Sequence, residues 1–138
     1  EAARADGADH GINYKRENVT ERALELNGGR PVDLVIEHVG GDQFGQCLHA
    51  LRKGGRLVTC GGHAGEVVPF DIIPFFRTQR SVIGSFVFTP GEVEKCLGLC
   101  ARGLVTPLVH QAFPLAEAAA AMELLETRTA FGKILLIP

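Results

Sequence analysis

The sequence predicts an α/β fold built on a parallel sheet, and three features lead to this prediction. Short apolar runs alternate with segments of helical spacing, a pattern typical of βαβ units. The run Val32–Val39 is almost continuously apolar and rich in β-branched residues, as expected for a strand buried on both faces of a parallel sheet. Glycine pairs follow two of the apolar runs, at Gly40-Gly41 and Gly61-Gly62, where the chain must turn sharply after a strand.

The first half of the chain alternates between the two types of element. Residues 1–7 have the pattern of a helix end that stops at Gly7, and a short strand is expected at Gly11–Tyr14. Apolar residues at helical spacing predict a helix over Glu17–Leu26, which the Asn-Gly-Gly sequence after it ends. After the strand Val32–Val39, we expect a helix from Asp42, a good N-cap residue, to Leu51.

The second half continues the alternation. The Gly54-Gly55 pair is expected to turn the chain into a second buried strand. Pro74 suits the first turn of a short helix. The strands expected here are Arg56–Cys60, Ser81–Phe88 and Lys133–Ile137, with an extended piece at Val105–Phe113, and the helices are within Val68–Phe76, at Gly91–Ala101 and at Leu115–Glu126.

Composition excludes several classes of protein. The 138 residues are 46% hydrophobic and 22% charged, which is ordinary for a globular chain of one domain or parts of two. A net charge of −2, with basic residues scattered along the chain, argues against nucleic-acid binding. No apolar run reaches the roughly 18 residues of a membrane span, and the first ten residues lack a secretory apolar segment, so we expect a cytoplasmic protein.

The four cysteines do not form a recognisable metal motif. Cys47, Cys60, Cys96 and Cys100 contain no C-x-x-C pair, which excludes zinc-ribbon and thioredoxin-type sites. Cys96 and Cys100 share a helix face, but no His or Asp stands beside them to complete a ligand set. We therefore expect reduced thiols and no metal site in this chain.

Ligands of parallel α/β sheets bind beyond the carboxyl ends of the strands. The segments in that position are His38–Gly41, Cys60–His63 and Ser85–Val87. Either histidine has the chemistry of a general acid or base, although a polar side chain lining a cleft is the plainer interpretation. Glu37 lies within a buried run and should have a partner, and we interpret it as structural.

Five features in order carry a resemblance to a known family. They are GADHGINYK, VDLVIEHVGG, LRKGGRLVTCGG, VIGSF and the tail FPLAEAAAAMELLE followed by FGKILLIP. The chain resembles the C-terminal part of the medium-chain dehydrogenase/reductase family, which includes zinc alcohol dehydrogenases and zinc-free quinone and enoyl reductases. The family's G-x-G-x-x-G turn is absent here.

The resemblance implies a partial Rossmann-type, doubly wound parallel sheet containing strands three to six, with helices on both faces. Residues 1–103 would be an incomplete NAD(P)-binding domain, and 104–138 the C-terminal segment of a GroES-like catalytic domain. Strands four to six should keep a parallel core. Gly11–Tyr14 and Lys133–Ile137 would lose their neighbours and be displaced or paired with another molecule.

The resemblance also implies an activity and partners. The whole protein would be an oxidoreductase that transfers hydride between NADP or NAD and an alcohol or carbonyl, a quinone or an activated alkene. Zinc would bind only through residues outside this chain, and no catalytic residue is assigned within it. The chain alone should be inactive. A homodimer would form through strand 81–88.

The cofactor-binding residues implied by the family pattern lie in five places. Gly40, with His38 and Val39, would let the cofactor approach the backbone, and Gly61 and Gly62 would lie beside the nicotinamide and its ribose. Ser85 and Phe86 would meet the carboxamide. Tyr14, followed by Lys15 and Arg16, would lie near the adenosine phosphate, and Lys133 would approach the pyrophosphate. Each position also has a plain structural interpretation, as a turn, a strand cap or a solvated cation.

Two other functions remain open from the sequence. The pair VDLVIEHV and LRKGGRLV also occurs in S-adenosylmethionine-dependent methyltransferases, although those domains end in an antiparallel hairpin that the tail does not suggest. A non-catalytic, dimerising remnant is the other alternative, since a sheet edge carrying Phe86 and Phe88 would favour association.

Overall fold

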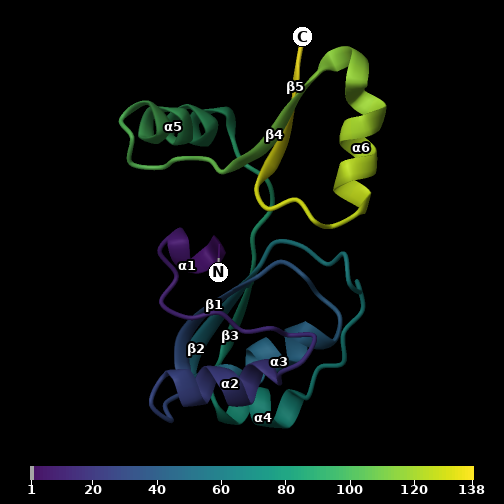
Figure 1. Cartoon of the computed structure of the whole chain (residues 1–138). Coiled ribbons are helices and arrows are strands. Elements are labelled where there is room, and N and C mark those ends of the chain that lie inside the picture. Colours follow the sequence, from purple (N-terminus) through teal and green to yellow (C-terminus); the bar gives the residue numbers. More distant parts are fainter. Residues whose placement is uncertain (1) are drawn as a thin grey trace. The chain divides into compact units, whose positions relative to one another are not determined.

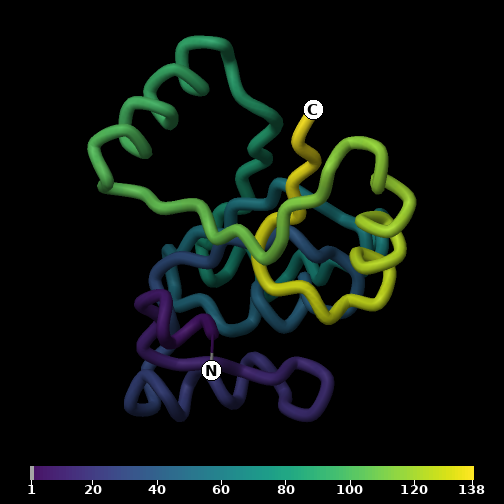
Figure 2. Tube along the Cα trace, turned by 45° about the horizontal axis from the view of Figure 1, so that its top comes forward, coloured from purple at the N-terminus to yellow at the C-terminus, as the bar shows by residue number. Residues whose placement is uncertain are grey.

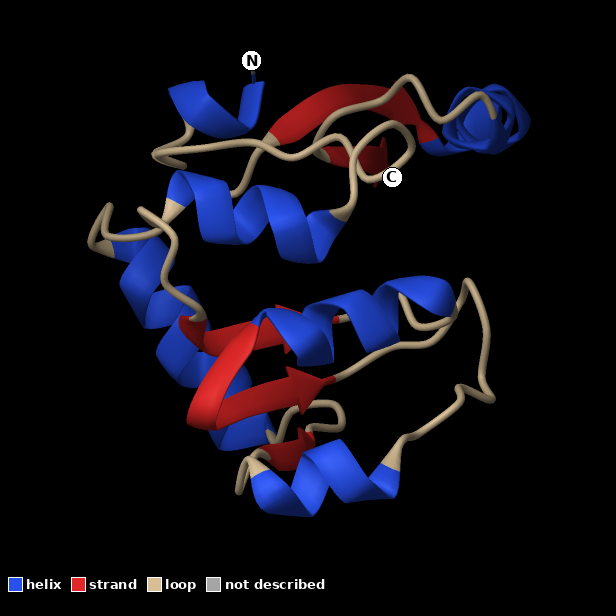
Figure 3. Cartoon of the chain, turned by 90° about the horizontal axis from the view of Figure 1, so that it is seen from below, coloured by secondary structure: helices blue, strands red, loops and turns tan. Residues whose placement is uncertain are grey.

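The computed structural model describes residues 2–138 and divides into two units (Figure 1). The first unit covers residues 3–87 and the second covers residues 88–138. The strands form two separate sheets, one in each unit (Figure 3).

The first unit contains a parallel three-stranded sheet. Its strands are β1 (Val32–Glu37), β2 (Leu51–Thr59) and β3 (Ser81–Gly84), in the order β1-β2-β3. Val35 pairs with Leu57, which in turn pairs with Val82, so these three side chains lie on one face. The expected parallel core is therefore confirmed.

The helices of this unit are short. They are α1 (Ala2–Ala5), α2 (Val19–Leu26), α3 (Asp42–Ala50) and α4 (Ile72–Arg77). The side chains of Asn18 and Asp71 cap the first turns of α2 and α4 by accepting backbone N–H groups. Helix α3 packs against β1 and β2, and α2 packs against α3.

The core lies between α3, α4 and one face of the sheet. Phe44 and Leu48 of α3 pack with Leu51 and Leu57 of β2, and Phe75 of α4 adds to this cluster. The fold class is confirmed, and α3 and α4 cover the same face of the sheet. Because every connection in the order β1-β2-β3 moves in the same direction, right-handed crossovers place α3 and α4 on the same side.

The opposite face of the sheet is left open. Leu34, Ile36 and Ile83 point to that face in register and are 53%, 69% and 45% exposed. Apolar side chains on a sheet face normally pack against another layer. This face is therefore an uncovered apolar surface of the first unit.

The second unit is a helix and a two-stranded sheet with its own covering helix. Its elements are α5 (Pro90–Ala101), β4 (Val109–Pro114), a short 3-10 helix (Leu115–Glu117), α6 (Ala118–Glu126) and β5 (Lys133–Ile137). Strands β4 and β5 pair in parallel, with α6 packed against them. Helix α5 has no buried residue and stands apart from the other elements of this unit (Figure 2). The expectation that Lys133–Ile137 lacks a partner within the chain is wrong.

Several expected strands also differ from the structure. Gly11–Tyr14 forms no strand, because no neighbouring strand pairs with it. The strand expected over Ser81–Phe88 ends at Gly84 because only four of its residues have partners in β2. Strand β2 begins at Leu51, and Gly54-Gly55 lie within an irregular section of it rather than before it.

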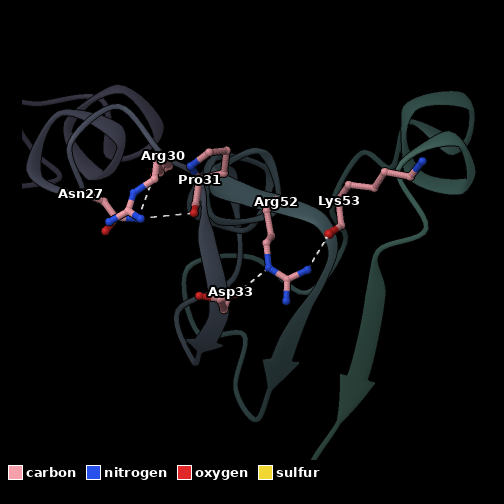
Figure 4. Close-up of polar contacts among 6 residues, drawn as sticks. All are labelled: Asn27, Arg30, Pro31, Asp33, Arg52 and Lys53. Atoms are coloured by element: carbon pink, nitrogen blue, oxygen red, sulfur yellow. Dashed lines mark hydrogen bonds and ion pairs between the residues drawn. The ribbon is translucent and has the colours of Figure 1, made fainter.

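Polar contacts fix the turn at the amino end of β1 (Figure 4). The Asn27 side-chain amide donates to the carbonyl oxygens of Arg30 and Pro31, at 2.8 and 3.3 Å. Asp33 of β1 forms an exposed ion pair with Arg52 of β2.

None of the helices in residues 2–138 has the length and apolar character needed to cross a membrane.

Candidate functional site

The loops that follow β1 and β2 are joined to one another at the carboxyl edge of the sheet. The amide of Cys60 donates to the Glu37 carbonyl at 3.0 Å, which closes the ladder between the strands. Beyond it, the amide of Ala64 donates to the Val39 carbonyl at 2.8 Å and that of Gly41 to the Gly65 carbonyl at 3.1 Å. Residues 38–41 and 60–65 therefore form one hydrogen-bonded junction, called here the loop junction.

Glycine is required where these loops cross. A Cβ on Gly40 would lie 2.5 Å from the Gly65 carbonyl oxygen and 2.8 Å from the Gly62 Cα. A Cβ on Gly61 would lie 2.5 Å from the carbonyl oxygen of His38. Gly40 also has a φ of 76°, which favours glycine on its own. The glycine pairs are therefore needed for the close packing of two loops as well as for turning the chain.

A buried carboxylate lies beneath the loop junction. Glu37 is 3% exposed, and one of its oxygens, Oε1, accepts the backbone N–H groups of Val39 and Gly40, both at 2.7 Å. The other oxygen, Oε2, accepts the hydroxyl of Thr59 from the neighbouring strand at 3.3 Å. The partner expected for this acid is thus its own following loop, and the side chain ties the ends of β1 and β2 together.

Four other predicted residues lie at the same edge. The rings of His38 and His63 extend from the two loops and have centroids 6.2 Å apart. The amide of Ser85, directly after β3, donates to the Thr59 carbonyl at 2.8 Å. Phe86 follows it and is 88% exposed. The carboxyl ends of all three strands therefore contribute to one surface.

A cavity of about 210 Å³ opens beside the loop junction. Its lining combines the predicted residues Tyr14, His38 and Val39 with Ile12, Val19, Ile36, Glu37, Gln43 and Cys47. Ligand pockets usually have volumes of about 300–1,000 Å³, so this cavity has room for part of a dinucleotide. Burial, and secondarily the negative charge of Glu37, raises the pKa of the Cys47 thiol.

All of the predicted cofactor-binding residues except Lys133 lie at the carboxyl edge of the first sheet, in the cavity or in the loops that follow its strands. Tyr14, His38 and Val39 share the cavity, Gly40, Gly61 and Gly62 form the loop junction, and Ser85 and Phe86 follow the next strand. Lys133 belongs to β5 of the second unit, where it is exposed. Sequence reasoning expected a partner and a structural role for Glu37 but did not identify the partners, and it missed Thr59 and Gly65.

The described residues offer no zinc site. Within residues 2–138, no three His, Cys, Asp or Glu side chains come close enough together to hold a metal ion. The two histidines at the loop junction lack a third ligand among the described residues. No step through zinc is derived for this chain.

Comparison with known proteins identifies the family. The sequence profile of a family described as "Zinc-binding dehydrogenase" matches residues 7–136. The chain belongs to this zinc-binding dehydrogenase family. The quinone oxidoreductase of Pseudomonas aeruginosa is 32% identical over 99% of the chain, which spans 45% of that relative. The chain therefore covers less than half the length of this member of the zinc-binding dehydrogenase family.

Solved structures of the family have the same fold. An NAD-dependent alcohol dehydrogenase superimposes with a TM-score of 0.83 and 31% identity, over 99% of this chain and 40% of that one. A 2-octenoyl-CoA carboxylase reductase, in complex with NADP and 2-octenoyl-CoA, gives 0.84 and 30%, over 99% of this chain and 34% of that one. These likenesses confirm the partial Rossmann-type fold expected from sequence.

The zinc-binding dehydrogenase match removes the methyltransferase alternative. It extends from residue 7 to residue 136 and so includes the tail as well as the sheet. The last two strands, β4 and β5, pair in parallel rather than as the antiparallel hairpin of methyltransferases. The division at residues 103 and 104 between two domains stays a prediction.

Proposed function

We propose that the protein carrying this chain is an NAD(P)-dependent oxidoreductase acting on an alcohol or carbonyl, a quinone or an activated alkene. The bound nicotinamide would supply the hydride chemistry, and this chain would supply part of the cofactor-binding wall. The observation that carries the proposal is the loop junction at the carboxyl edge of a parallel sheet, where α/β proteins bind nucleotides. Membership of the family supports the reaction type.

The chemistry of the wall suits the proposed ligand. Gly61 and Gly62 are at least partly exposed and carry no side chain, so a flat ring and a ribose can lie close to the backbone there. The neighbouring cavity provides an apolar lining, with Tyr14 and His38 as its polar rim. These residues bind and orient the cofactor, and none of them is assigned a chemical step.

The direct test is cofactor binding and turnover by the intact protein. NADPH and NADH are titrated separately while the fluorescence of the reduced nicotinamide is followed. Each cofactor is then mixed with a quinone, an enoyl thioester and a simple aldehyde in turn. We expect saturable binding and oxidation of the cofactor by at least one acceptor. Absence of binding by both cofactors at millimolar concentration would reject the proposal.

We further propose a preference for NADP over NAD. Tyr14 is half exposed, and Lys15 and Arg16 follow it on an exposed turn that the Asn13 side chain and backbone hold. Neither cation forms an ion pair with the described residues, so both are available to a phosphate. Replacing both by alanine should lower the ratio of NADPH to NADH affinity about tenfold, since hydrogen bonds to charged groups contribute about 1.5–3 kcal/mol. An unchanged ratio would contradict this preference.

The remaining assignments stay predictions. Lys133 is exposed on β5, where its charge is available to a cofactor pyrophosphate, and Lys133→Ala should raise the KM for cofactor without altering the fold. Dimerisation through residues 81–88 and a cytoplasmic location also remain predictions. Within residues 81–88, only Ser81–Gly84 forms a strand. The proposed dimer contact would therefore use the edge of β3 and the exposed residues that follow it.

A further inference from the structure

Glycine-rich loops after parallel strands often bind phosphate, because their backbone N–H groups point outward and are free to donate. In the loop junction, five of these groups are already used within the chain. Val39 and Gly40 donate to the Glu37 carboxylate, Gly41 donates to Gly65, Ala64 to Val39, and Gly65 to Gly62. The amides of residues 39–41, on the loop that follows β1, are therefore not available to a ligand.

The acceptor that removes two of these donors also carries a charge. Glu37 is 3% exposed, and its Oε1 atom lies 2.7 Å from both the Val39 and Gly40 nitrogens. A buried carboxylate directly beneath the loop repels any anion placed above it, because the low local dielectric screens the charge poorly. The same side chain thus withdraws the donors and opposes a phosphate electrostatically.

The geometry points to Glu37 as a positioning residue that decides which part of the dinucleotide lies over the loop junction. By holding the Val39 and Gly40 amides away from the ligand, it makes this surface accept the nicotinamide and ribose groups, which carry no negative charge, and reject phosphate. The inference rests on the proposed function, since it concerns the same cofactor. It adds a specificity-determining role for a side chain that acts through the two backbone amides it holds.

The test compares two replacements of Glu37 in the intact protein. Glu37→Met keeps the length of the side chain but removes the acceptor, so the two amides become free to donate. The KM for NADPH should rise about tenfold with kcat changed less than about threefold, and competitive inhibition by inorganic phosphate should strengthen about tenfold, as hydrogen bonds to charged groups are strong. Glu37→Gln keeps an amide oxygen at the same place but removes the charge, so its KM for NADPH should stay within about threefold of wild type, while inhibition by phosphate should strengthen less than in Glu37→Met.

Asp33→Asn is the matched control. Asp33 is an acid on the same strand, but it lies at the opposite end and forms only an exposed ion pair with Arg52 (Figure 4). Exposed pairs contribute little, so this variant should have wild-type KM and phosphate sensitivity. Wild-type values in Glu37→Met, or equal damage in Glu37→Gln and Glu37→Met, would overturn the inference.

Backbone amide exchange in the wild-type protein gives a second test that needs no variant. We expect the Val39 and Gly40 amides to exchange slowly in the free protein and to remain slow when NADPH is bound. Fast exchange in the free protein that slows on binding would show that these amides donate to the cofactor, and would overturn the inference even if Glu37→Met does not fold. Failure of the wild type to bind either cofactor would instead reject the proposed function.

Discussion

Gly40 is restricted both by its backbone angle and by its neighbours. Its φ of 76° lies in the left-handed region, and an added Cβ would meet the backbone of Gly65 and Gly62. Gly40→Ala should therefore cost about 3 kcal/mol, which combines the left-handed penalty with overpacking. Gly28 is the matched control, since its φ is 64° but nothing lies within 4 Å of the added Cβ. Gly28→Ala should cost about 1 kcal/mol in the same urea unfolding experiment, and equal costs for the two variants would contradict the close crossing of the loops.

Cys47 should be the least reactive of the partly accessible thiols. Burial first, and the Glu37 carboxylate second, raise its pKa from the ordinary value of 9.0, so the thiolate is scarce at neutral pH. Alkylation at pH 8 should modify the exposed Cys60 and Cys96 before Cys47, as followed by mass spectrometry of the peptides. Early labelling of Cys47 in the folded protein would contradict this order.

The same pKa shift predicts a dependence of stability on pH. Because the folded-state pKa of Cys47 is raised, its contribution is complete below the unfolded value and is lost as the pH rises through the folded value. The difference in unfolding free energy between wild type and Cys47→Ala should therefore shrink above about pH 9. A difference that stays constant with pH would show that this thiol does not titrate differently on folding.

The contrast between Gly40 and Glu37 shows what single residues reveal in a sequence. Glycine pairs after apolar runs predicted the position of the loop junction, because few other residues allow such turns. Glu37 could be recognised only as an acid that needs a partner. A carboxylate looks the same in sequence whether it accepts an amide, a hydroxyl or a cation, and the identity of its partners depends on the folded loop.

Helix α5 depends on local interactions more than on packing. Thr89 and Glu92 form a reciprocal cap, in which the Thr89 hydroxyl accepts the Glu92 N–H and the Glu92 carboxylate accepts the Thr89 N–H. No residue of the helix is buried. Thr89→Ala should therefore cost about 1 kcal/mol of local stability and speed amide exchange throughout α5. Thr127→Ala, which alters the end of α6, should leave exchange in α5 unchanged, and a similar effect of both variants would contradict a local cap.

The elements that sequence predicted well have strong local signals, and those that it missed depend on distant partners. An apolar, β-branched run marked β1 and helical spacing marked α2. The capping residue expected for α3 was wrong, because Asp42 is the first residue of that helix and Gly41, which has no side chain, is its N-cap. Strands β4 and β5 are separated in the sequence by α6 and its flanking turns, and nothing in either strand's own sequence specifies the other as its partner. Gly11–Tyr14 shows the reverse case. Its sequence has the pattern of a strand, but no strand forms because no neighbouring strand pairs with it.

As a whole, the chain combines a small buried core with extensive exposed apolar surface. Its buried apolar side chains are Phe44, Leu48, Ala50, Leu51, Leu57, Phe113 and Ala121, while the open face of the first sheet carries Leu34, Ile36 and Ile83. A chain of these 138 residues alone should therefore bind a hydrophobic dye strongly and associate as its concentration rises. Ile36→Gln should weaken dye binding with little change in stability, since Ile36 is 69% exposed. A monomer at high concentration that binds no dye would contradict the prediction.

The junction of α3 with β2 has a consequence for how this chain tolerates changes in length. Ala50 ends the helix and Leu51 begins the strand, and these consecutive residues are 2% and 0% exposed. With no linker between them, one inserted residue would rotate the helix by about 100° relative to the strand or reverse the inward and outward side chains of the strand. Either change would expose Leu48 or Leu57, whereas the exposed turn at Gly28-Gly29 has no such coupling. Insertions and deletions among homologous proteins should therefore accumulate at that turn and be absent at the Ala50–Leu51 bond.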